Sequence, residues 1–184
     1  SYWDVNVNGT INLLKVMNKY KCRTIVFSSS ATIYGLSNNE CIVENSPIKP
    51  INPYGRTKAA IEQLLNDLYN SQTDGWKIAN LRYFNPIGAH HTGLIGEDPT
   101  GVPTNIFPYI TQVAAGNLDK VNVFGNDWHT LDGTGIRDYI HVMDLAEGHV
   151  LAMEHLAANK NQIVNLNLGR GKGTSVLELI NIFE

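Results

Sequence analysis

The segment Thr24-Ile-Val-Phe-Ser-Ser-Ser30 decides how this chain folds, because an apolar run ends there in three hydroxyl side chains. The apolar part predicts a buried strand of a parallel sheet, since such strands are covered on both faces and carry continuous hydrophobic runs. We expect Ser28 and Ser29 to satisfy backbone groups at the strand end, whereas Ser30 is a candidate site residue.

A helix is predicted to follow at Pro53-Tyr-Gly-Arg-Thr-Lys58. Pro53 suits the first helical position, and Asn52 can cap the helix with its side chain. Apolar residues then recur at helical spacing: Ala60, Ile61, Leu64, Leu65 and Leu68. A strand that ends in hydroxyls and a helix that begins with Tyr54 and Lys58 place these groups at the carboxyl edge of a sheet, where open α/β sheets bind ligands.

Tyr54, Lys58 and Ser30 form a candidate catalytic group. The tyrosine and the lysine lie four positions apart and share one face of a helix. We expect the ammonium of Lys58 to lower the pKa of the Tyr54 phenol from its ordinary ~10. Such a trio can take a proton from an alcohol whose carbon exchanges a hydride with a nicotinamide. The spacing alone also fits a packed tyrosine beside a surface lysine; the surrounding strand and helix favour catalysis.

Helices and strands alternate along the whole chain. We expect helices at 3–19, 53–70, 106–115 and 143–158, a final helix from about 176, and strands at 23–29, 77–83, 137–141 and 163–168. This alternation predicts an α/β fold with a doubly wound parallel sheet. The Gly- and Pro-rich stretch 86–104 is long for a connection and is predicted to be functional. The glycines at 169–173 predict a tight strand-to-helix turn capped by Thr174 or Ser175.

Four motifs carry a more specific signal: Phe27-Ser-Ser-Ser-Ala-Thr-Ile-Tyr-Gly35, Pro53-Tyr-Gly-Arg-Thr-Lys58, Leu81-Arg-Tyr-Phe-Asn-Pro-Ile-Gly88 and Gly133-Thr-Gly-Ile-Arg-Asp-Tyr-Ile-His-Val142. They resemble the UDP-glucose 4-epimerase family of extended short-chain dehydrogenases/reductases, as do Phe124-Gly-Asn-Asp127 and Gly96-Glu-Asp-Pro99. The resemblance implies a Rossmann-like sheet with part of a smaller nucleotide-sugar-binding domain. It also implies NAD as cofactor and interconversion of UDP-glucose and UDP-galactose by oxidation at C4', rotation of the 4'-keto sugar and re-reduction.

The resemblance also implies which residues hold NAD. Tyr54 would remove the proton of the 4'-hydroxyl with help from Ser30, and Lys58 would bind the nicotinamide ribose. The strand end at Tyr83 and Phe84 would touch the nicotinamide, although ordinary packing is the alternative for Phe84. Asn6 would order the lysine through water, with a capping or surface role as the alternative.

A further set of residues is implied in substrate binding. Asn85 and Arg137 would contact the diphosphate, and a guanidinium suits a phosphate because it can bind it bidentately. The alternative for Arg137 is an ion pair with Asp138 or Asp144. The full implied set is Ser30, Ala31, Thr32, Tyr54, Tyr83, Phe84, Asn85, Asn105, Ile106, Asn122, Val123, Phe124 and Arg137, of which Asn122 to Phe124 would line the uracil pocket or form a plain edge strand.

By the same resemblance, residues 1–85 would be the C-terminal part of the NAD-binding Rossmann domain and 86–136 mainly the substrate domain, while 137–184 would be mixed. Both ends of the chain fall in segments with helical apolar spacing, which predicts an internal fragment that lacks the first βαβ unit. We expect the isolated chain to bind no NAD and to be inactive. The full-length protein would be a homodimer, with the helices at 3–19 and 53–70 as candidate contacts by analogy.

Composition excludes several classes of partner. A net charge of −3 offers no basic surface for nucleic acid. No apolar run approaches the ~18 residues of a membrane helix, so no membrane partner is expected. The two cysteines, Cys22 and Cys41, suggest reduced thiols in a cytoplasm. The histidines lack Cys or acidic partners at ligand spacing, so no metal site is predicted.

Two alternatives remain open. One is a neighbouring nucleotide-sugar enzyme on the same fold, such as a dehydratase, a decarboxylase or an epimerase that prefers N-acetylated sugars. A 4,6-dehydratase would typically carry Asp-Glu after Ser-Thr, whereas Ala31-Thr32 follow Ser30 here. The other alternative is that the chain as given is a non-catalytic piece.

Overall fold

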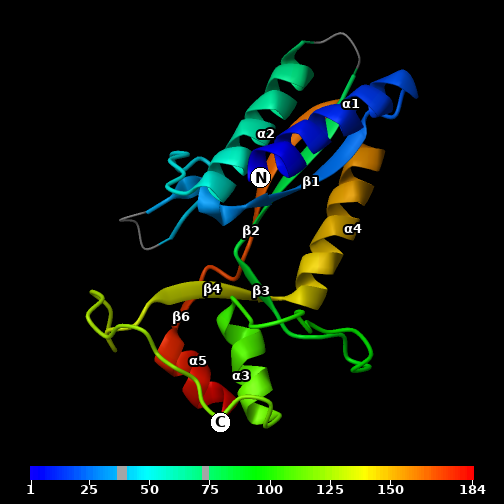
Figure 1. The fold of residues 1–184 in the computed structure, drawn as a ribbon. Helices are drawn as coiled ribbons and strands as arrows, with labels where there is room; N and C mark the ends of the chain where they lie inside the picture. The colour runs from blue at the N-terminus through cyan, green and yellow to red at the C-terminus, as the bar shows by residue number, and fades with distance from the viewer. Residues whose placement is uncertain (37–40, 72–74) are drawn as a thin grey trace. The chain divides into compact units, whose positions relative to one another are not determined.

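The computed structural model describes residues 1–36, 41–71 and 75–184. These residues form two compact units, the first of Ser1–Phe84 and Leu145–Leu168 and the second of Asn85–Asp144 and Gly169–Glu184. Figure 1 labels the helices and strands of both units. In chain order the elements are η1 (Trp3–Asn8), α1 (Gly9–Lys19), β1 (Thr24–Ser30), η2 (Ala31–Tyr34), α2 (Pro53–Asn70), β2 (Lys77–Tyr83), β3 (Asn85–Ile87), α3 (Ile106–Ala114), β4 (Ile136–His141), α4 (Val142–Ala158), β5 (Gln162–Leu168), β6 (Gly173–Ser175) and α5 (Val176–Phe183).

The first unit contains a parallel sheet in the order β1-β2-β5. Its register places Ser30, Tyr83 and Leu168 level with one another at the carboxyl ends of the three strands. The amide of Phe84 then donates to the carbonyl of Leu168 at 3.0 Å. The predicted parallel sheet is confirmed, and its carboxyl edge carries the serine-rich end of β1.

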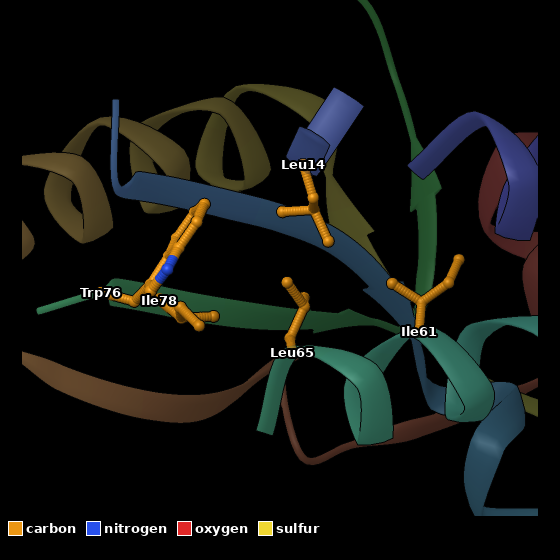
Figure 2. Close-up of a cluster of buried hydrophobic side chains, with 5 residues drawn as sticks. All are labelled: Leu14, Ile61, Leu65, Trp76 and Ile78. Carbon is orange, nitrogen blue, oxygen red and sulfur yellow. The ribbon is translucent and has the colours of Figure 1, made fainter. Parts of the chain in front are cut away.

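Helices cover both faces of this sheet. On one face, Leu14 of α1 and Leu65 of α2 belong to a buried cluster with Ile78 of β2, and Figure 2 shows these side chains gathered with Ile61 and Trp76. On the other face, Ala79 and Leu81 of β2 belong to a cluster with side chains of α4, Ala152 and Leu156. Successive residues of a strand point to opposite faces, so β2 supplies both layers. Each fully buried Leu or Ile contributes ~1.5–3 kcal/mol, and the doubly wound arrangement is confirmed.

The first turn of α2 is built as the sequence predicts. Asn52 has an extended backbone, and its side chain accepts a hydrogen bond from the amide of Gly55 at 2.7 Å. Pro53 occupies the first turn, where its missing amide hydrogen has no helical partner to lose. This cap determines where the helix begins and therefore where Tyr54 lies.

The N-terminal helix differs from its prediction. One helix over 3–19 was expected, but Trp3–Asn8 is a π-helix that continues into α1. A π-turn carries one extra residue per turn and is often found at functional sites. Here the turn contains Asn6, whose side chain contacts α2.

The second unit is not wholly parallel, because it contains a short strand that the sequence did not predict. Strands β3 and β4 pair in parallel, but β6 pairs with β4 in the antiparallel direction. The predicted tight turn before α5 is instead a loop leading into β6. The carboxylate of Asp138 holds this loop, because it accepts the amides of Arg170 at 2.9 Å and Gly171 at 2.7 Å.

Helices α3 and α5 pack on β4 through Ile110, Leu179 and Tyr139. Ser175 caps α5 in a capping box with Glu178, which confirms one of the two predicted caps. No helix in the described part of the chain is long and apolar enough to cross a bilayer.

Candidate functional site

The three serines at the end of β1 take three different roles. The Ser28 hydroxyl lies 2.6 Å from the hydroxyl of Tyr83. The Ser29 hydroxyl donates to a carboxylate oxygen of Glu62. Ser30 caps η2, because its hydroxyl accepts from the amide of Thr32 at 3.3 Å and from its hydroxyl at 2.9 Å. The prediction that Ser28 and Ser29 bond mainly to backbone is therefore wrong, since each serine hydroxyl contacts another side chain.

Tyr54 lies half-buried at the start of α2. The ring of Tyr2 packs edge-on against it, with the ring centroids 5.6 Å apart. Burial raises the pKa of the Tyr54 phenol above its ordinary value, and the hydrogen bond with Ser30 acts in the opposite direction without cancelling it. Ser30 therefore acts on the phenol of Tyr54 in the direction that the proposed partnership requires, while its role in proton transfer stays a prediction.

The ammonium of Lys58 is also half-buried. Its Nζ donates to the carbonyl of Ser28 at 2.8 Å and lies 5.6 Å from the centroid of the Tyr54 ring. Burial lowers the pKa of Lys58, because a desolvated ammonium gives up its proton more easily. Within the described residues no carboxylate pairs with it. Its positive charge therefore remains available to a ligand.

One sequence-based prediction about this pair is wrong. Lys58 was expected to lower the pKa of Tyr54, but the pKa of Tyr54 is raised. The ammonium is bound to a main-chain carbonyl and lies 5.6 Å from the ring centroid, and the causes of the shift in the Tyr54 pKa are burial, Ser30 and Tyr2. The desolvation of the phenol therefore decides the direction in which its pKa shifts.

A second set of contacts holds the first turn of α2 in place. The side-chain amide of Asn6 donates to the Thr57 hydroxyl at 3.0 Å, which in turn donates to the carbonyl of Tyr54 at 2.7 Å. A Cβ atom on Gly55 would lie 2.8 Å from the backbone oxygen of Thr32, so only glycine permits this close approach. The structure therefore connects Asn6 to the turn that carries Tyr54, whereas its contact with Lys58 through water stays a prediction.

A buried ion pair between Arg82 and Glu62 lies next to Ser29, and the sequence did not predict it. The guanidinium of Arg82 donates to both carboxylate oxygens of Glu62 at 3.0 and 2.7 Å. It also donates to the hydroxyl of Tyr34 at 2.8 Å, and that hydroxyl donates to Asn167 at 2.7 Å. Burial alone would lower the pKa of Arg82. The hydrogen bonds and the opposite charge of Glu62 outweigh burial, so the pKa of Arg82 is raised above its ordinary value. The one available signal was an arginine within the predicted buried strand at 77–83.

Tyr83 and Phe84 end β2 and are both partly buried. The Tyr83 hydroxyl contacts Ser28 and also the Nε2 atom of His149 on α4. Burial raises the pKa of Tyr83. His149 was not predicted as a site residue, and the only signal for it was a histidine within the apolar residues of α4.

Arg137 is exposed on β4 in the second unit and is not held by an acidic side chain. Its guanidinium donates to the neighbouring carbonyl of Ile136 at 2.9 Å. The carboxylate of Asp138 binds the loop amides of Arg170 and Gly171 instead. Among the residues described, neither Asp138 nor Asp144 forms an ion pair with it, so the ion-pair interpretation is wrong.

The other predicted substrate residues of the second unit are more scattered. Asn85 donates from its side chain to the carbonyl of Asp138 at 3.0 Å, and Asn105 precedes α3 without bonding it through its side chain. Ile106 packs beside the apolar cluster of α3. Residues 122–124 form no strand, which excludes the edge-strand interpretation, and Phe124 is 89% exposed. The remaining predicted residues, Ala31 and Thr32, lie in η2 of the first unit.

The described residues contain no cluster of His, Cys, Asp or Glu that could hold a metal ion. The groups gathered at the carboxyl edge are hydroxyls, phenols and one ammonium. These hydrogen-bonding groups suit the ribose hydroxyls and the carboxamide of a nicotinamide nucleotide, and they also suit the hydroxyls of a sugar.

Comparison with known proteins agrees with this chemistry. The chain is 54% identical over 183 residues to "UDP-glucose 4-epimerase 2" of Arabidopsis thaliana, and the match covers 100% of this chain and 52% of the relative. A UDP-glucose 4-epimerase from Stenotrophomonas maltophila, solved with NAD and formylated UDP-arabinopyranose, matches with a TM-score of 0.94 and 52% identity over 98% of this chain and 53% of its own.

The Bifidobacterium longum enzyme, solved with NAD+ and UDP, matches with a TM-score of 0.92 and 49% identity over 98% of this chain and 53% of its own. The chain thus spans about half the length of the relatives it matches. The model of the NAD dependent epimerase/dehydratase family matches residues 1–167. The fold, the donors at the sheet edge and these matches agree, and the chain belongs to the NAD dependent epimerase/dehydratase family.

Proposed function

We propose that the whole protein interconverts UDP-glucose and UDP-galactose with NAD as its cofactor. The observation that carries the proposal is the group of Ser30, Tyr54 and Lys58 at the carboxyl edge of the sheet. In this group the Ser30 side chain lowers the pKa of the Tyr54 phenol against the effect of burial, and the Lys58 ammonium lies 5.6 Å from the centroid of the Tyr54 ring. The similarity to UDP-glucose 4-epimerases over the whole of this chain supports the choice of substrate.

In this proposal Tyr54 takes the proton of the sugar's 4'-hydroxyl and later returns it, while Ser30 shares that proton. A phenol whose pKa is raised by burial needs a nearby positive charge to act as a base at neutral pH. The Lys58 ammonium, which lacks a carboxylate partner within the described residues, supplies part of that charge.

The donors at the sheet edge fit a nicotinamide nucleotide. Lys58, Tyr54 and Ser30 would hold it together with Tyr83 and Phe84, and Asn6 would support them through Thr57. When bound, NAD would supply the acceptor, and then the donor, for the hydride at C4'. The Lys58 ammonium is half-buried and would orient ribose hydroxyls, because an ammonium donates in three directions.

In this proposal many of the substrate residues bind the UDP moiety, and few contact the hexose. The sugar must present both faces in turn, so its own contacts have to be few: Ala31 and Thr32 in η2, with Ser30 and Tyr54. Arg137 and Asn85 would hold the diphosphate, and Asn105, Ile106, Asn122, Val123 and Phe124 would enclose the rest of the nucleotide. The exposed Arg137 guanidinium, which has no carboxylate partner within the described residues, supports this assignment.

The remaining features of the proposal concern the whole protein. Residues 1–85 would contribute to its NAD-binding domain and 86–136 mainly to its substrate domain, with 137–184 shared between them. We also infer a homodimer that pairs through the helical segments 3–19 (η1 and α1) and 53–70 (α2). We infer a cytoplasmic location as well, which the exposed free thiols of Cys22 and Cys41 support.

The test is conversion of UDP-galactose to UDP-glucose by the full-length protein, with this chain assayed in parallel. Turnover that Tyr54→Phe lowers by ~100-fold or more would support the proposal, because a positioned proton-transfer group contributes ~10²–10⁴-fold. Absence of turnover in a full-length protein that carries bound NAD would refute the substrate assignment and direct the search to other nucleotide sugars.

A further inference from the structure

The hydroxyl of Tyr83 joins two elements that lie on different layers of the first unit. It lies 2.6 Å from the Ser28 hydroxyl on β1, and it also contacts Nε2 of His149 on α4. The ring of Tyr83 packs on the imidazole, with the centroids 5.3 Å apart and the planes tilted by 60°. Both the polar and the aromatic contact therefore join the same two side chains.

The second nitrogen of His149 determines the direction of these hydrogen bonds. Its Nδ1 lies 2.8 Å from the carbonyl of Leu145, which can only accept, so Nδ1 carries the proton. In the neutral imidazole Nε2 is then a bare acceptor, and the Tyr83 hydroxyl must donate to it. A phenol has one proton to give, so Ser28 must supply the proton of its own contact with Tyr83. Burial raises the pKa of Tyr83, which keeps the phenol protonated and able to donate.

Ser28 connects this pair to the catalytic lysine. The same residue that contacts Tyr83 through its hydroxyl accepts the Lys58 ammonium on its carbonyl at 2.8 Å. Lys58 belongs to α2, which packs on one face of the sheet, whereas His149 belongs to α4 on the other face. A continuous path of contacts therefore runs from α4 through two strand ends to the ammonium.

We propose that His149 is a positioning residue, which holds the Tyr83 phenol and, through Ser28, the carbonyl that directs Lys58 toward Tyr54. The inference rests on the epimerase function proposed above. His149 touches neither substrate nor cofactor in this scheme and acts only through Tyr83. Its effect on turnover should therefore disappear when the Tyr83 hydroxyl is absent.

A double-mutant cycle on the full-length protein tests this dependence. His149→Phe should lower kcat for UDP-galactose by about tenfold, the effect of one lost hydrogen bond, with KM changed by no more than about twofold. His149→Gln, which keeps an acceptor near the position of Nε2, should restore most of kcat. The double variant Tyr83→Phe/His149→Phe should be no slower than Tyr83→Phe alone.

His155→Phe is the matched control, because it makes the same substitution on an exposed part of α4, where among the described residues the histidine side chain bonds only Asn159 and Gln162. Turnover by the wild type and by this control reports on the proposed function alone. If both turn over UDP-galactose, then unchanged kcat in His149→Phe, or costs that multiply in the double variant, would overturn the inference.

Nitrogen NMR of His149 gives a readout that does not need turnover. The inference expects a neutral ring protonated on Nδ1, with an Nε2 signal that shifts in Tyr83→Phe. A ring protonated on Nε2, or a signal that ignores the Tyr83 substitution, would overturn it even if the protein proves to act on another sugar nucleotide.

Discussion

Replacing Glu62 with glutamine should destabilise the protein by about 3 kcal/mol, near the lower end of the ~3–5 kcal/mol found when one partner of a buried ion pair is removed. The side chains of Arg82 and Glu62 are only 3% and 5% exposed, so the guanidinium would keep its charge without a counterion in a site closed to water. The carboxylate also accepts from Ser29, and glutamine offers one acceptor oxygen where Glu62 uses two.

Urea unfolding of the full-length protein measures this loss. With a dependence on urea of ~1–3 kcal/mol per molar, the midpoint should fall by roughly 1–3 M. Asp67→Asn is the matched control on the same helix, because within the described part of the chain its carboxylate accepts only from the exposed Gln63, at 2.8 Å. This variant should change stability by no more than ~0.5 kcal/mol.

The reasoning would be refuted if Glu62→Gln unfolded at the same urea concentration as Asp67→Asn. A second variant separates the charge from the packing. Glu62→Met combined with Arg82→Met removes both charges, and it should be more stable than Glu62→Gln because no unpaired ion remains. A double variant less stable than the single one would mean that the bonds from Arg82 to Tyr34 and to the carbonyl of Glu44 matter more than the ion pair.

Three further predictions concern the helix that carries Tyr54, a surface turn and the proposed diphosphate contact. Gly55→Ala should lower kcat by ~10-fold or more, because the new Cβ would push the helix start away from the backbone of η2. Gly9→Ala, where a Cβ meets nothing within 4 Å, should leave kcat unchanged. The pKa of Asp132 is lowered, chiefly by its hydrogen bond from Ser175, so this carboxylate stabilises the fold above the ordinary aspartate pKa and loses that effect as pH falls below it. The difference in unfolding free energy between wild type and Asp132→Asn should therefore shrink as the pH is lowered from 7 through ~4. Arg137→Gln should raise KM for UDP-galactose by ~10–100-fold with a smaller change in kcat, since a hydrogen bond to a charged group contributes ~1.5–3 kcal/mol; an unchanged KM would remove Arg137 from the diphosphate site.

The elements that the sequence predicts well are those with a simple hydrophobic period. The apolar run of β1 and the apolar stripe and cap of α2 each depend on local signals, and both appear as expected. The π-turn at Trp3–Asn8 has no periodic signal, because its apolar residues resemble those of an ordinary helix. The antiparallel strand β6 is three residues long, which is too short for any pattern to reveal.

The candidate site follows the same division. The Tyr54–Lys58 spacing within α2 and the position of Ser30 at the end of β1 each depend on a signal within one element, so the sequence predicts where these residues lie. The partners of Arg82 and His149 are not local: 20 residues separate Arg82 from Glu62, and 66 separate Tyr83 from His149. A buried polar residue in an apolar segment signals that a partner must exist, but only the three-dimensional packing identifies it.

The three consecutive serines give a physical reason why this sheet edge can hold a catalytic group. Successive side chains of a strand point to opposite faces, so adjacent serines cannot bond to the same layer. Ser29 bonds to α2 through Glu62, whereas Ser28 bonds through Tyr83 to His149 of α4. Hydrogen bonds thereby connect the end of β1 to helices on both faces of the sheet. Ser30, the last residue of the strand, caps η2 and acts to lower the pKa of Tyr54. A proton-transfer group needs its members held to within a fraction of an ångström, and a strand end fastened on one face alone would remain free to tilt toward the other.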